Sequence, residues 1–81
     1  MIYTDIITAT GKTLRVPNSH PILSEIEIDP VHWEKFLQLR DEPGVKILGH
    51  EAPHDGWMTI YVACASELVK DQLDDGWHGY R

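Results

Sequence analysis

Residues 22–30 read "ILSEIEIDP" and combine a strand pattern with the start of a helix. Within this stretch Ile26 and Ile28 fall on one face of an extended chain. The acidic residues Glu25 and Glu27 fall on the other face, because successive side chains of a strand point to opposite sides. This period of two predicts a half-buried strand over residues 22–28.

The end of the same stretch predicts a helix. Asp29 can accept hydrogen bonds from the unpaired amides of a first helical turn, and Pro30 suits the first helical position. We expect the helix to run to about residue 40, where the letters "DEPG" end it because proline cannot continue the hydrogen-bond ladder. Its apolar stripe is formed by Trp33, Phe36 and Leu37.

Two further strands and a second helix follow. The segments "VKILGHE" (residues 45–51) and "WMTIYVACA" (residues 57–65) are typical of strands, and the turn letters "APHDG" between them favour an antiparallel hairpin. Ser66 can cap a helix that we expect to stop at Gly76.

The order strand, helix, strand, strand, helix predicts an α+β fold. In a ferredoxin-like fold or a related split β-α-β unit, two helices pack on one face of an antiparallel sheet. The first residues, rich in Ile, Thr and Tyr, predict an N-terminal β-hairpin that completes or extends this sheet. At 81 residues we expect one α+β domain over residues 1–81.

Composition argues against several classes of function. Thirteen acidic residues against seven scattered basic ones disfavour binding to nucleic acid, which needs a clustered basic face. The longest uncharged apolar runs are far shorter than the roughly 20 residues that cross a membrane, so we expect no membrane contact. The single Cys64 permits no internal disulfide, and a cytoplasmic location is therefore the default. The dispersed glycines match no nucleotide-binding pattern, and we expect no cofactor.

The surplus aromatic residues of the last strand suggest a contact surface. Trp57, Thr59 and Tyr61 project from the face opposite the core, near Glu25 and Glu27. Exposed Trp and Tyr on a rigid strand make good anchors for a protein partner. The alternative is that the N-terminal hairpin covers these rings, in which case they serve packing.

A metal site is the alternative hypothesis. His50, His54 and Asp55 can approach one another across the loop of residues 49–57, and His78 can join them if the tail folds back. Zinc needs three or four such ligands, but no helical histidine pair or cysteine pair fixes the geometry here. We expect a turn whose imidazoles do not bind metal.

These observations favour a small non-catalytic protein-binding module, acting as a homodimer or with another protein. Compact acidic proteins of this kind are common among bacterial and phage accessory proteins. The alternative is a regulatory domain that binds a small ligand or metal through residues 49–57. An enzyme with a cleft built from His32, His50 and Asp55 is the third hypothesis, and we assign no catalytic residue.

Overall fold

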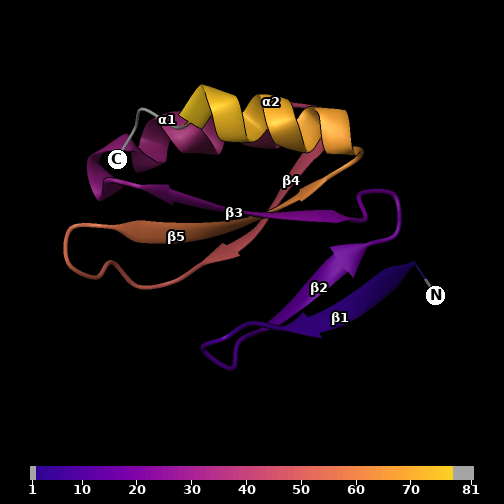
Figure 1. Ribbon diagram of the computed structural model, residues 1–81, viewed down its shortest axis with the longest axis horizontal. Coiled ribbons are helices and arrows are strands. Elements are labelled where there is room, and N and C mark those ends of the chain that lie inside the picture. Colours follow the sequence, from indigo (N-terminus) through magenta and orange to yellow (C-terminus); the bar gives the residue numbers. More distant parts are fainter. Residues whose placement is uncertain (1, 78–81) are drawn as a thin grey trace.

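The structure is a computed structural model that describes residues 2–77 (Figure 1). The predicted strands and helices are observed, with short 3-10 turns on either side of the first helix. In chain order the elements are β1 (Tyr3–Ile7), β2 (Thr13–Pro17), β3 (Ile22–Ile28), the 3-10 turn η1 (Pro30–His32), α1 (Trp33–Leu37), the 3-10 turn η2 (Gln38–Asp41), β4 (Val45–His50), β5 (Met58–Cys64) and α2 (Glu67–Trp77).

The strands form two antiparallel sheets. β1 and β2 make a two-stranded sheet, and the second sheet has the order β3-β5-β4. Strands β3 and β4 both run antiparallel to β5, which lies between them. The α+β class is therefore confirmed. The ferredoxin-like assignment is not confirmed, because the hairpin forms a sheet of its own and does not extend the three-stranded one.

Burial of two hydrophobic side chains explains why the hairpin stacks on the larger sheet. Leu14 and Val16 of β2 are buried, and β2 contacts β4. Gly49 of β4 lies against the hairpin: a Cβ atom there would lie 3.6 Å from Cε of Lys12 and 3.9 Å from Cδ2 of Leu14, which are ordinary van der Waals distances. In Figure 1 the three-stranded sheet lies between the hairpin and the two helices.

The core joins both helices to all three strands of the larger sheet. Alternate residues of β3 and β5 enter it, as the period of two predicted. Phe36 of α1 is fully buried, and its ring lies 4.7 Å from that of Trp77. The buried cluster comprises Ile26, Ile28, Phe36, Val45, Met58, Ile60, Val62, Cys64, Leu73 and Trp77.

The helices differ from prediction at their ends. Asp29 accepts a hydrogen bond of 3.0 Å from the Val31 amide, which confirms the predicted cap. The expected continuous helix is split, however, into the 3-10 turn η1, the α-helix α1 and the 3-10 turn η2. Short 3-10 turns are frequent at the ends of α-helices. α2 continues through Gly76, so the predicted stop there is wrong. No helix of the described residues is long and apolar enough to cross a membrane.

Candidate protein-binding surface

Strand register brings together most of the predicted contact residues. Glu25 of β3 pairs directly with Tyr61 of β5, and Glu27 pairs with Thr59. Trp57 immediately precedes β5 and is 41% exposed. Both glutamates are exposed, and Thr59 is half-buried. These side chains therefore share the sheet face opposite the core.

Tyr61 differs from its neighbours because the hairpin covers it. Its side chain is only 4% exposed, and its hydroxyl group donates a hydrogen bond of 3.0 Å to Oε1 of Glu51. Thr10, in the turn of the hairpin, donates to the same oxygen over 2.6 Å. Of the two arrangements that the sequence left open, the covered one holds for Tyr61, which cannot act as an exposed anchor.

The contacts around Glu51 fasten the hairpin to the sheet. Lys12 Nζ donates to the carbonyl oxygen of His50 over 2.6 Å, next to the Glu51 interaction. Hydrogen bonds from Thr10 and then from Tyr61 hold the pKa of Glu51 below its ordinary value. Burial, and then the hydrogen bond to Glu51, raise the pKa of the Tyr61 hydroxyl. Both shifts favour a charged carboxylate beside a neutral phenol.

The histidine loop is a tight turn. Asp55 and Gly56 both have left-handed backbone, with φ of 53° and 82°. His54 and Trp57 exchange backbone hydrogen bonds of 2.8 and 2.9 Å across them. This is the arrangement that Asp-Gly favours between antiparallel strands, so the predicted turn is observed.

The structure brings together only part of the predicted metal ligand set. Nε2 of His54 lies 3.1 Å from Oδ2 of Asp55. The ring of His50 instead lies 4.9 Å from that of Trp33, and His78 falls outside the described residues. Across residues 2–77, no group of three His, Cys, Asp or Glu side chains is placed to hold a metal ion.

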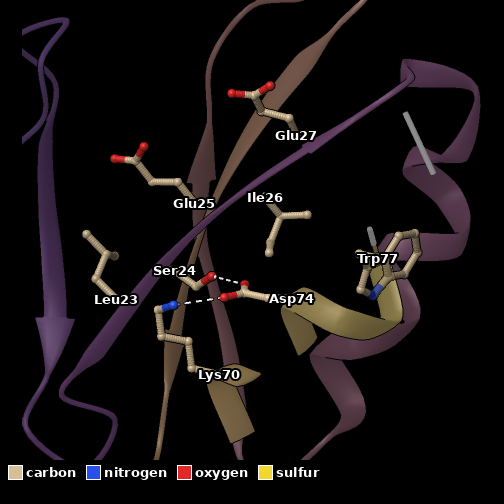
Figure 2. Close-up of a pocket in the computed structure, with 8 residues that line it drawn as sticks. All are labelled: Leu23, Ser24, Glu25, Ile26, Glu27, Lys70, Asp74 and Trp77. Carbon is tan, nitrogen blue, oxygen red and sulfur yellow. Dashed lines mark hydrogen bonds and ion pairs between the residues drawn. The ribbon is translucent and has the colours of Figure 1, made fainter. Parts of the chain in front are cut away.

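Sequence reasoning missed a groove along β3 (Figure 2). It has a volume of about 230 Å³ and is lined by the five consecutive residues Leu23–Glu27 and by Lys70, Asp74 and Trp77 of α2. Successive side chains of a strand point to opposite faces, so five consecutive residues share one hollow only if it runs along the edge of the strand. The groove therefore follows the outer edge of β3.

The α2 wall of this groove is an internally paired polar cluster. Ser24 Oγ donates to Oδ1 of Asp74 over 2.6 Å, and Lys70 Nζ donates to Oδ2 over 2.8 Å (Figure 2). Burial opposes the charged form of Asp74, but the hydrogen bonds from Lys70 and Ser24 outweigh it and hold the pKa of Asp74 below its ordinary value. The hydrogen bond to Asp74 correspondingly raises the pKa of Lys70.

Two sequence signals point to this cluster in retrospect. Lys70 and Asp74 are four residues apart, the spacing of neighbours on a helix face. Ser24 is a polar residue on the otherwise apolar face of β3, and it is 3% exposed, so its hydroxyl group needs a partner. No signal along the chain connects Ser24 to Asp74, because 50 residues separate them.

Strand β3 ends the larger sheet. Within the described part of the chain it pairs with β5 alone, and nothing pairs with its opposite edge. Such an edge presents backbone N–H and C=O groups to which another strand can bind. Comparisons with family models, with curated proteins and with solved structures found no match to this chain.

Proposed function

We propose that this chain is a small non-catalytic protein-binding module whose contact surface is the β3 side of the larger sheet. The observation that carries the proposal is the groove along the unpaired edge of β3. An extended segment of another protein can add to such an edge as a further strand, with main-chain hydrogen bonds giving affinity and side-chain contacts giving specificity.

Neighbouring side chains support this assignment. Glu25 and Glu27 stand exposed along the edge strand, and their cross-strand neighbour Thr59 is half-buried beside them. Trp57 is 41% exposed next to the start of β5 and can bury a large area at low entropic cost. Tyr61 is on the same face but is buried and donates to Glu51, the residue that also binds Thr10 of the hairpin, so it is left out of the contact surface. The proposed contact set is therefore Glu25, Glu27, Thr59 and Trp57.

The surroundings of β3 suit a preformed site. The Ser24–Asp74 hydrogen bond joins the strand to α2, and Ile26 and Ile28 anchor its inner face in the core. A partner would therefore meet a strand that is already ordered, which lowers the entropic cost of binding.

The test is capture of partners from the native host with matched variants. The tagged wild-type chain is compared with Glu25→Lys/Glu27→Lys and with Asp41→Lys/Glu42→Lys, which makes the same charge change at exposed positions away from β3. We expect one protein to co-purify with the wild type and with the Asp41/Glu42 variant, and to be lost with the β3 variant. The proposal fails if no protein is retained above a tag-only control, or if the β3 variant retains the same protein as the wild type.

A further inference from the structure

We infer that the segment bound by β3 is an extended strand of a separate protein that carries Lys or Arg at alternate positions. This inference rests on the proposed function and specifies the chemistry of its partner. It combines three features of the groove: its course along the edge of β3, the exposed acidic side chains of Glu25 and Glu27 on one side, and the ion pair of Lys70 with Asp74 on the other.

The side of the groove that carries Glu25 and Glu27 favours basic residues in the bound strand. Glu25 and Glu27 are exposed on one face of β3, about 6 to 7 Å apart at the usual rise per residue. Residues opposite them on an added strand would bring their Cβ atoms within about 4.5–5.5 Å, where opposite charges stabilise pairing and like charges oppose it. Two basic residues of the partner, separated by one residue, match this spacing.

The side of the groove that faces α2 favours an uncharged residue between the two basic residues of the bound strand. The side chain at the intervening position would face α2, beside Ser24 and Ile26, with Trp77 forming part of the wall. The ion pair of Lys70 and Asp74, 2.8 Å apart, already satisfies the charges there. A charged group at this position would be partly desolvated with no charge left to pair with, so a small or apolar side chain fits better. The predicted pattern is basic, uncharged, basic.

Charge also argues against a second copy of this chain as the occupant. If two copies of β3 paired antiparallel over their full length, the two-fold axis relating them would pass beside the central residue, Glu25. That arrangement places Glu25 directly opposite its own counterpart, and like charges in directly opposed positions are destabilising. Each chain also carries a net charge of −6, which opposes their approach. A basic strand from a different protein removes both penalties.

The inference is tested with synthetic peptides as long as β3, using fluorescence anisotropy. One peptide has lysine at alternate positions with valine or threonine between. A second has glutamate in place of lysine, and a third is the lysine peptide with alternate backbone amides methylated on the edge that would face β3. We expect the lysine peptide to bind at least about tenfold more tightly than the glutamate peptide, since attraction is replaced by repulsion. The methylated peptide should lose binding because it cannot form the ladder.

Protein variants locate the effect. Glu25→Gln/Glu27→Gln should weaken binding of the lysine peptide about three- to tenfold, as expected for two solvent-exposed charge pairs. Asp41→Asn/Glu42→Gln makes the same charge change elsewhere and should leave the affinity within about twofold. Both pairs of residues are exposed, and circular dichroism is the check that each variant is folded.

Equal binding of the lysine and glutamate peptides would overturn the inference, as would undiminished binding of the methylated peptide or of Glu25→Gln/Glu27→Gln. These outcomes are separable from failure of the proposed function. If Glu25→Lys/Glu27→Lys loses the host protein in the capture experiment while the lysine and glutamate peptides bind equally, the proposed protein-binding function is supported and the predicted basic pattern is wrong. If no host protein is captured at all, the proposed function itself fails.

Discussion

The hydroxyl group of Tyr61 donates a 3.0 Å hydrogen bond to Oε1 of Glu51, an oxygen that also accepts a 2.6 Å hydrogen bond from Thr10. This shared acceptor ties the N-terminal hairpin to the face of the larger sheet that lies opposite the core. The hairpin consequently occupies the centre of the surface that the sequence pointed to. The proposed contact surface is therefore at the sheet edge of β3, where Glu25 and Glu27 stay exposed.

Removing this hydroxyl group should loosen the hairpin. We expect Tyr61→Phe to lower the free energy of unfolding by about 1 kcal/mol, a typical net value for one intramolecular hydrogen bond. Tyr3→Phe is the matched control, because Tyr3 is 41% exposed, and it should change stability by less than about 0.5 kcal/mol. Urea unfolding of both variants makes the comparison, and an equal loss in the two would contradict the role of the Tyr61 contact.

Acid should weaken the same contact. The pKa of Glu51 is lower in the folded chain than its ordinary value of 4.5. Its contribution to stability is therefore fully present above that ordinary value and is lost as the pH falls through the folded-state pKa. Asp74 shifts in the same direction, so it adds a second loss in the acid range.

Glu51→Gln separates the two carboxylates. This variant should show a smaller drop in stability than the wild type between neutral pH and a pH below the ordinary carboxyl pKa, with the remaining drop including the loss from Asp74. Urea titrations at the two pH values measure it. The assignment to Glu51 is wrong if the variant and the wild type lose the same stability on acidification.

A further prediction concerns the hydrophobic core, where Phe36 is fully buried against Trp77. Phe36→Ala should cost about 3–5 kcal/mol, from lost burial and the cavity left behind. Since this approaches the whole stability of a small domain, Phe36→Leu provides a milder, measurable step. Val31→Ala, at a residue 76% exposed in the preceding turn, should stay within about 0.5 kcal/mol. If Val31→Ala and Phe36→Ala lowered the free energy of unfolding equally, Phe36 would not be part of the core.

The start of α2 depends on Ser66, whose Oγ accepts a hydrogen bond of 3.3 Å from the Val69 amide. Ser66→Ala should destabilise the chain by about 1 kcal/mol, because this amide has no partner within the helix. Ser66→Asp keeps an acceptor at the same position and should retain most of the stability. Thermal unfolding that ranks Ala and Asp equally would remove the capping role.

Features encoded by neighbouring residues were predictable. The alternation in residues 22–28 gave the bounds of β3, and Asp55 with Gly56 gave the tight turn between β4 and β5, because both signals act within a few residues. Asp29 and Ser66 were identified as helix caps for the same reason.

Features that depend on distant contacts were not predictable. The stacking of the hairpin brings Lys12 and Leu14 next to Gly49 of β4, and no pattern along the chain specifies that contact. The groove likewise depends on Asp74 reaching Ser24 across 50 residues. The sequence therefore placed Glu25 and Glu27 near Tyr61 correctly but left open whether the face was covered.

Hydrogen exchange at the backbone of β3 tests the central claim most directly. The exchange rate of each amide is measured by NMR with and without the lysine peptide. Strand addition predicts slower exchange for alternate amides within Ile22–Ile28, those that point away from β5, with little change in Tyr3–Ile7 of the hairpin. Slowed exchange confined to the hairpin, or no change along β3 when the peptide is bound, would contradict it.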